Sequence, residues 1–143
     1  MAALPFALHP QLSHDTTPVG DLALARVLLM NDANYPWLIL VPRRAGASEI
    51  VDLTDDEQAL LMREIAQASR ALKAVSACDK LNVAAIGNVV PQLHVHVVAR
   101  RRDDLAWPKP VWGVAPAKPY EAGARDALMT RLRDALGVML TQP

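Results

Sequence analysis

The chain has 143 residues and a mass of 15.5 kDa, which fits one domain with its own core and makes disulfides or a structural metal unnecessary. With 52% hydrophobic and 21% charged residues, the composition excludes a chain that is disordered throughout. Fifteen basic residues balance fifteen acidic ones, so there is no large net charge to hold a nucleic acid or an anionic membrane.

The single cysteine, Cys78, cannot form an internal disulfide or a paired-cysteine metal site, which favours a reducing compartment. The first ten residues lack the basic region and long apolar stretch of a secretory signal. No apolar run approaches the roughly 20 residues needed to cross a bilayer. We therefore expect a soluble, cytoplasmic protein with a single domain over residues 1–143.

The first regular elements are predicted within residues 19–42. Residues 25–30 and 37–41 are short apolar runs separated by a turn-rich segment, and they predict two antiparallel strands. Pro42 ends the second strand and opens a loop that reaches residue 53.

A capping box predicts the start of a long helix at Thr54. The threonine hydroxyl can accept from first-turn amides, and the carboxylate of Glu57 can reach back to the cap amide. Apolar residues then recur at spacings of three and four and form one stripe: Leu61, Ile65, Ala68, Leu72 and Val75. This helix needs a sheet to lie on, and we assign the stripe no chemical role.

Two further strands are predicted at residues 80–86 and 93–99. The segment that joins them contains Gly87 and Pro91, which break helix and strand alike, so the two strands should be neighbours. Residues 107–119 are rich in proline and too poor in donors for a central strand, so they should cover a surface. A second amphipathic helix is predicted over residues 124–136, with a glycine just past its end.

Two histidines share one face of the strand predicted at residues 93–99. Because alternate side chains of a strand point the same way, Gln92, His94 and His96 lie together. The opposite face is apolar and should take the core; it comprises Leu93, Val95, Val97 and Ala99. A strand fixes such a pair of imidazoles better than a loop would, so the pair can line one site.

Three interpretations of the histidine pair stay open on the residues alone. A neutral imidazole can attack a phosphate anhydride while a second histidine donates hydrogen bonds to the developing charge or the leaving oxygen. The pair can instead bind a metal ion if the fold supplies a third ligand, such as His9, His14, Asp15 or Asp103. In the third interpretation the two histidines lie on a half-buried strand and have no chemical role.

Two neighbouring segments bear on a phosphate ligand. Gly87 and Asn88 are typical of a turn whose backbone amides approach an anion, because glycine leaves the room for it. The arginines at residues 100–102 form the only clear basic run, and they are interpreted either as a solvated turn or as a phosphate-steering patch.

Residues 87–100 read Gly-Asn-Val-Val-Pro-Gln-Leu-His-Val-His-Val-Val-Ala-Arg, and this segment is similar to the signature of the histidine triad (HIT) superfamily. The order of parts agrees with the bacterial type of this superfamily: a hairpin, Val-Pro at the end of its second strand, a capped helix, two strands, the histidine segment and Trp107-Pro108. The resemblance spans residues 19–113. The motif is short, and its placement makes it specific.

The resemblance implies an α+β fold in which an antiparallel sheet carries one long packed helix and a C-terminal helix. It also implies a homodimer that binds a small-molecule nucleotide against the sheet and needs no cofactor. Family members hydrolyse or transfer nucleoside monophosphates through a nucleotidyl-histidine, so a diadenosine polyphosphate or a phosphoramidate is an implied substrate. The alternatives are a non-catalytic nucleotide sensor or interaction protein, and a metal-dependent hydrolase that uses the histidine pair.

By position, the nucleophile of the family falls on His94. The histidine that contacts the phosphate and assists the leaving group falls on His96. The first histidine of the family pattern is replaced by Gln92, which can donate and accept hydrogen bonds but cannot carry a proton. The resemblance therefore implies a supporting role for Gln92, with an effect on activity that the sequence leaves open.

The resemblance also suggests ligands for the rest of a nucleotide. Asn31 or Asp32 falls where family members place a ribose ligand, and Asn88 matches a polar position beside the phosphate. For Asn31 and Asn88, the alternative is a residue present because it tolerates a turn.

Four other residues are weighed as parts of the site. Trp107 and Trp112 are expected to pack at the edge of the core, with stacking on a base or a partner subunit as the alternative. His9 and His14 have no motif around them and are expected at the surface or at a helix cap.

Overall fold

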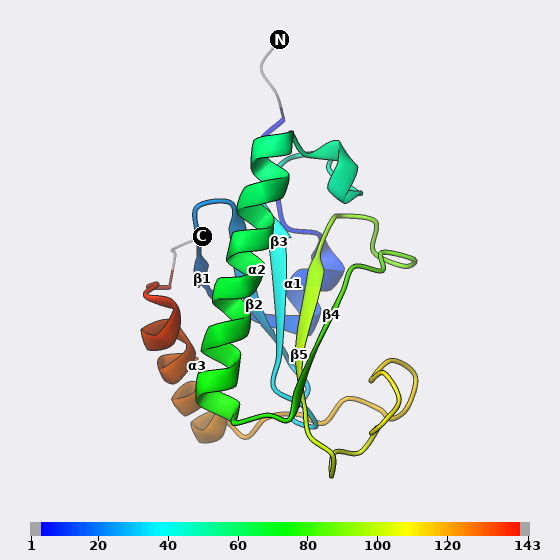
Figure 1. Ribbon diagram of the computed structural model, residues 1–143, viewed down its shortest axis with the longest axis vertical. Coiled ribbons are helices and arrows are strands. Elements are labelled where there is room, and N and C mark those ends of the chain that lie inside the picture. The colour runs from blue at the N-terminus through cyan, green and yellow to red at the C-terminus, as the bar shows by residue number, and fades with distance from the viewer. Residues whose placement is uncertain (1–3, 141–143) are drawn as a thin grey trace.

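A five-stranded antiparallel sheet lies at the centre of the protein (Figure 1). The computed structural model describes residues 4–140. The elements in chain order are α1 (Pro10–Asp15), β1 (Thr16–Asp21), β2 (Ala25–Met30), β3 (Trp37–Pro42), the short 3-10 helix η1 (Ile50–Asp52), α2 (Asp55–Ser76), β4 (Lys80–Ala84), β5 (Val95–Arg100) and α3 (Ala122–Leu136). The strand order in the sheet is β1-β2-β3-β5-β4. The α+β fold that the resemblance implies is confirmed.

The long helix begins where its capping box predicts. The Thr54 hydroxyl accepts from the Glu57 amide at 3.2 Å, and the Glu57 carboxylate accepts from the Thr54 amide at 3.0 Å. The resulting helix α2 runs for 22 residues and lies across the sheet, with α3 beside it (Figure 1). No helix within residues 4–140 is long and apolar enough to span a membrane.

The predicted strands are present with shifted ends. β4 and β5 are neighbours, as expected, but β4 ends at Ala84 and β5 begins at Val95. His94 therefore lies in the loop immediately before β5, and His96 lies within the strand. α3 begins at Ala122, slightly ahead of the predicted start.

Neither α1 nor β1 was predicted from the sequence. The helix α1 has six residues, which is too short for an apolar period to be visible. Strand β1 contains Pro18 and Gly20, and its pairing with β2 is irregular between them. An edge strand tolerates a proline because half of its amides face away from the sheet, and β1 is such an edge.

Buried clusters lie on both faces of the sheet. The face toward α2 and α3 takes the apolar side chains predicted for it, including Val95 and Val97 of β5. The opposite face is covered by the N-terminal segment and by loops, with Leu12 of α1, Ile39 of β3 and Val111 in one cluster. As a result β3 and β5 are buried along their full lengths. The face of the sheet that carries the histidines is covered by loops.

Candidate active site

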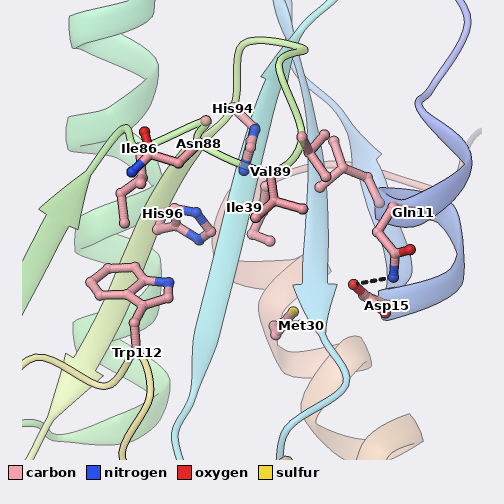
Figure 2. A pocket seen from close by; sticks show the side chains of 13 residues that line it. Gln11, Asp15, Met30, Ile39, Ile86, Asn88, Val89, His94, His96 and Trp112 are labelled. Carbon is pink, nitrogen blue, oxygen red and sulfur yellow. Dashed lines mark hydrogen bonds between the residues drawn. The ribbon is translucent and has the colours of Figure 1, made fainter.

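A cavity of about 330 Å³ lies on the loop-covered face of the sheet (Figure 2). Its polar side chains come from three segments: Gln11 and Asp15 of α1, Asn88 of the loop before β5, and the histidines His94 and His96. The apolar part of the wall comprises Leu12, Met30, Ile39, Val89, Val90 and Trp112. A largely apolar cleft with a few converging polar groups is typical of a small-molecule site.

His94 is a buried histidine with one ring nitrogen hydrogen-bonded to the backbone. Its Nδ1 lies 2.7 Å from the backbone carbonyl oxygen of Gln92. A carbonyl oxygen only accepts hydrogen bonds, so Nδ1 carries a proton, and in the neutral imidazole Nε2 keeps its lone pair. The neutral form of the ring that lines the cavity therefore offers an unprotonated nitrogen that can act as a nucleophile.

His96 has the opposite arrangement. The indole Nε1 of Trp37 donates to His96 Nδ1 at 3.0 Å, and because an indole N–H is only a donor, the proton of His96 lies on Nε2. Burial, together with the nearby His94, lowers the pKa of His96 to about 4. His96 is therefore neutral near pH 7 and can donate a hydrogen bond through Nε2.

The two imidazoles lie close together in the cavity. The ring centroids of His94 and His96 are 4.9 Å apart, and Trp112 packs edge-on against His96 at 5.1 Å (Figure 2). One ring offers an electron pair and the other an N–H donor, and neither needs a net charge to do so. This is the combination that attack on a phosphorus centre requires.

Gln92 precedes this pair in the sequence, and its side chain bonds the N-terminal segment. Its Oε1 accepts from the backbone N–H of His9 at 2.8 Å, and its Nε2 donates to the carbonyl oxygen of Ala7 at 2.8 Å. Both polar ends of the side chain are thus engaged with the N-terminal segment. Gln92 contributes to the wall of a smaller neighbouring cavity of about 170 Å³ that also touches His94.

Of the three residues predicted to bind the sugar and the phosphate, only Asn88 lines the cavity. The side-chain oxygen of Asn31 accepts from a threonine hydroxyl of β1 at 2.7 Å. Asp32 is buried, and its Oδ1 accepts from the backbone amides of Asn34 and Lys118 at 3.0 and 3.2 Å. These two side chains hold the turn after β2, and their role as ribose ligands stays a prediction.

Three residues of the site were missed or given another role by the sequence analysis. Asp15 was named only as a metal ligand, Trp37 was placed only in a predicted strand, and Gln11 was given no role. Alternation along β3 places Trp37 on the same face as Ile39, and Ile39 pairs with His96, so this signal was present in the sequence. No comparable signal pointed to Gln11, because α1 itself was not predicted.

The basic run does not line the cavity; Arg101 and Arg102 are consistent with a solvated turn, whereas Arg100 fits neither interpretation. Arg100 is 1% exposed, and its guanidinium donates to the Asp104 carboxylate at 2.7 and 3.0 Å and to Asn82 at 2.8 Å. It is neither solvated nor free for a phosphate, because Asp104 and Asn82 accept from its donors. Although burial opposes it, hydrogen bonds from Arg100 and from the backbone lower the pKa of Asp104 to about 2, which preserves this ion pair. Arg101 and Arg102 are exposed.

Of the two tryptophans and the two N-terminal histidines, only Trp112 lines the cavity. Trp107 packs against the Arg100 guanidinium at 5.6 Å, as expected, whereas Trp112 forms part of the cavity wall. The Nδ1 of His9 caps α1 by accepting from a first-turn amide at 3.1 Å. The His14 side chain is 82% exposed. The expectation of a cap or surface position is confirmed for both histidines.

A third ligand for a metal ion is not placed beside the histidine pair. Among residues 4–140, no group of three histidine, cysteine, aspartate or glutamate side chains is arranged to hold one. Asp15 shares the cavity with His94 and His96 but does not complete such a group.

Comparisons with known proteins agree with this architecture. A family model described as "HIT domain" matches residues 11–103. A histidine triad protein from Bradyrhizobium japonicum has a TM-score of 0.92 and 53% identity, covering 93% of this chain and 99% of that one. A histidine triad protein from Marinobacter aquaeolei VT8 has a TM-score of 0.90 and 43% identity, covering 93% and 97% of the two chains.

A curated relative extends the comparison to a named activity. An "AP-4-A phosphorylase" from Mycobacterium tuberculosis (strain CDC 1551 / Oshkosh) is 41% identical over 107 residues, which cover 68% of this chain and 54% of the relative. The chain thus spans about half the length of the curated relatives it matches.

Proposed function

Because the chain belongs to the HIT domain family, whose model matches residues 11–103, we propose that it is a nucleotide-binding hydrolase or nucleotidyl transferase. The proposed substrate is a nucleoside phosphate anhydride or phosphoramidate. Dinucleoside polyphosphates are the substrates to test first, because of the AP-4-A phosphorylase relative. The observation that carries the proposal is the complementary protonation of His94 and His96 within one cavity.

His94 is the nucleophile in this proposal. The lone pair of Nε2 attacks the α-phosphorus and forms a P–N bond, while the bond to the leaving group breaks and its electron pair departs with that group. The imidazole becomes positively charged in this step. The Gln92 carbonyl oxygen, which accepts from Nδ1–H at 2.7 Å, stabilises that charge because the hydrogen bond strengthens as the ring becomes cationic.

His96 supplies the hydrogen bond that the developing negative charge needs. Trp37 holds its Nδ1 as an acceptor, so Nε2–H is the group presented to a phosphate or leaving-group oxygen. In the second step an oxygen of water, or of another acceptor such as inorganic phosphate, attacks the phosphorus. The P–N bond breaks with its electron pair returning to Nε2, and the proton of the attacking group passes to solvent. This step releases the nucleotide product and restores neutral His94, and neither step calls for a cofactor.

The test is a turnover assay in EDTA with a panel of dinucleoside polyphosphates and nucleoside phosphoramidates, with and without inorganic phosphate. We expect nucleotide release by the wild type and none by His94→Asn, which should still bind AMP because only the attacking atom is lost. Because P–N bonds hydrolyse in acid, quenching in alkaline denaturant followed by intact-mass measurement should reveal a wild-type adduct carrying one nucleoside monophosphate.

Other outcomes separate the alternatives. Full turnover by His94→Asn would rule out the covalent route. Turnover that EDTA abolishes and an added divalent cation restores would indicate metal-dependent hydrolysis. Nucleotide binding without turnover of any panel member would indicate a sensor.

We further propose that two copies of the chain assemble through β4. This strand forms one edge of the sheet (Figure 1), and its Val83 side chain is 50% exposed. The nearby Ile86 and Val89 are exposed as well. An edge strand with exposed apolar side chains offers unpaired backbone groups to a second chain, which supports a dimer at this edge.

A further inference from the structure

The N-terminal segment forms the side of the cavity that faces Trp112 and the histidines (Figure 2). Gln11, Leu12 and Asp15 of α1 line it. Gln11 Nε2 donates to Asp15 Oδ2 at 2.9 Å, so the amide oxygen of Gln11 and further lone pairs of the Asp15 carboxylate are left to accept hydrogen bonds.

Asp15 is the acidic member of this lining within the described chain. Its Oδ1 lies 2.9 Å from Nδ1 of the exposed His14, and the Asp15 side chain itself is 36% exposed. A carboxylate repels phosphate and accepts readily from hydroxyl groups. A nucleotide whose phosphate lies at His94 and His96 would therefore direct its hydroxyl groups, rather than a second phosphate, toward α1.

The position of Asp15 in the fold agrees with this orientation. Its backbone carbonyl accepts from the amide of Asn31 at 2.9 Å, so Asp15 lies beside the end of β2. The Oδ1 atoms of Asn31 and Asp32 at that strand end accept internal hydrogen bonds, and neither side chain lines the cavity. Among these three side chains, Asp15 is the one that lines the cavity and can accept from a ligand there.

Gln92 holds this part of the wall in place. Residues 4–9 form no helix or strand, and the amide of Gln92 bonds their backbone at two points, the Ala7 carbonyl and the His9 N–H, both at 2.8 Å. His9 in turn caps α1. The Gln92 side chain thus connects the histidine segment to the start of the helix that carries Asp15.

We propose that Asp15, with Gln11, binds the ribose hydroxyl groups of the nucleotide and that Gln92 is a positioning residue that holds α1 for this contact. The inference rests on the proposed function and adds a sugar subsite to it. It gives Gln92 a role in substrate affinity through α1 rather than in the chemistry at phosphorus.

The first experiment measures binding of AMP, 2′-deoxy-AMP and 2′,3′-dideoxy-AMP by isothermal titration calorimetry. Wild-type protein should lose about tenfold in affinity when the hydroxyl groups are removed, as for a lost charge-assisted hydrogen bond. Asp15→Ala and Asp15→Asn should weaken AMP binding, with the alanine variant losing about tenfold, and the three ligands should then bind alike. The matched control is Asp103→Ala, which removes an exposed aspartate outside the cavity and should keep the wild-type ratios.

The second experiment separates positioning from chemistry at Gln92. With a dinucleoside polyphosphate as substrate, Gln92→Ala should raise KM several-fold and leave kcat within about twofold, because only uniform binding is lost. Gln92→Glu keeps an acceptor for His9 but loses the donor to Ala7, so it should raise KM as well. In the Gln92→Ala background, Asp15→Ala should add little, since both changes disable the same contact.

Several outcomes would overturn the inference. If Asp15→Ala kept the preference for AMP over its deoxy analogues, or changed the preference between AMP and GMP instead, the ribose would not lie at Asp15. A fall in kcat at unchanged KM in folded Gln92→Ala, checked by circular dichroism, would place Gln92 at the reacting groups. If the wild type neither bound AMP nor turned over any substrate, the proposed function would fall and this subsite with it. Binding and turnover with unaltered ribose discrimination in Asp15→Ala would remove the subsite alone.

Discussion

His94 and His96 are the same residue type and are separated by a single residue, yet the hydrogen bonds at their Nδ1 atoms differ. The Nδ1 of His94 meets a carbonyl oxygen, and the Nδ1 of His96 meets an indole N–H. In the neutral rings, these two hydrogen bonds therefore leave Nε2 of His94 as an acceptor and Nε2 of His96 as a donor.

This assignment predicts the NMR spectra of the two imidazoles. At pH 7, long-range nitrogen–proton correlations should show His94 protonated at Nδ1 and His96 protonated at Nε2. Trp37→Phe removes the indole donor, so His96 should then exchange between both neutral tautomers while His94 stays unchanged. A wild-type spectrum with His96 protonated at Nδ1 would contradict the assignment of the donor.

The depressed pKa of His96 predicts how stability depends on pH. An unfolded chain protonates this ring below about pH 6.5, whereas burial and the neighbouring His94 delay protonation in the folded protein until about pH 4. The unfolded state therefore binds more protons between these values. The free energy of unfolding should fall as the pH drops through this window, by roughly 3 kcal/mol at most from this residue.

Urea unfolding at pH 7, 5.5 and 4.5 measures this dependence. His96→Asn should show a shallower loss of stability across the window than the wild type. His14→Asn, a change at an exposed histidine, is the matched control and should keep the wild-type slope. Equal slopes in wild type and His96→Asn would show that His96 is not titrating in this way.

At the scale of elements, one buried carboxylate connects the long helix to the sheet. Glu64 of α2 is 3% exposed, and its two oxygens accept from the backbone amides of Leu24 and Ala25 at 2.9 and 2.8 Å. These amides open β2, so the helix contact satisfies donors at the start of the strand.

Glu64→Gln should destabilise the protein, because the new amide group brings a donor against a backbone donor. We expect a loss of about 2 kcal/mol in the free energy of unfolding, measured by urea titration at pH 7. Arg63→Gln, an exposed charge-to-amide change on the same helix, should cost well under half of that. A loss no larger than that of Arg63→Gln would show that the two amide bonds contribute little.

The predictability of each element follows the length and regularity of its apolar pattern. The stripe of α2 and the apolar runs of β2 and β3 were sufficient to locate them, and the alternation around His94 and His96 assigned the faces of β5 correctly. The edge strand β1 and the six-residue α1 have no such pattern. The sequence consequently identified the reacting side of the cavity, and the side formed by Gln11 and Asp15 became visible only when contacts between distant segments were known.

At the scale of the whole molecule, β4 is the edge through which we propose dimerisation. Val83→Lys places a charge at this edge and should shift the protein from dimer to monomer mass in size-exclusion chromatography with light scattering. Val51→Lys changes a valine that is 79% exposed in η1 and should leave the mass unchanged. A wild-type monomer, or a Val83→Lys variant with the wild-type mass, would contradict assembly through β4.

The sheet carries a helix-packed cluster on one face and a loop-packed cluster on the other, and this separation bears on how such proteins can diverge. The cavity wall comprises residues of α1, loop residues such as Asn88 and Trp112, and strand side chains of the same face such as Ile39. The helices α2 and α3 and the helix-facing side chains of the strands do not line it. Substitutions in the two regions should act nearly independently, because the buried side chains of the two faces form separate clusters. New ligand preferences can therefore arise by exchange of residues on one face, while the folding determinants on the other face are inherited unchanged.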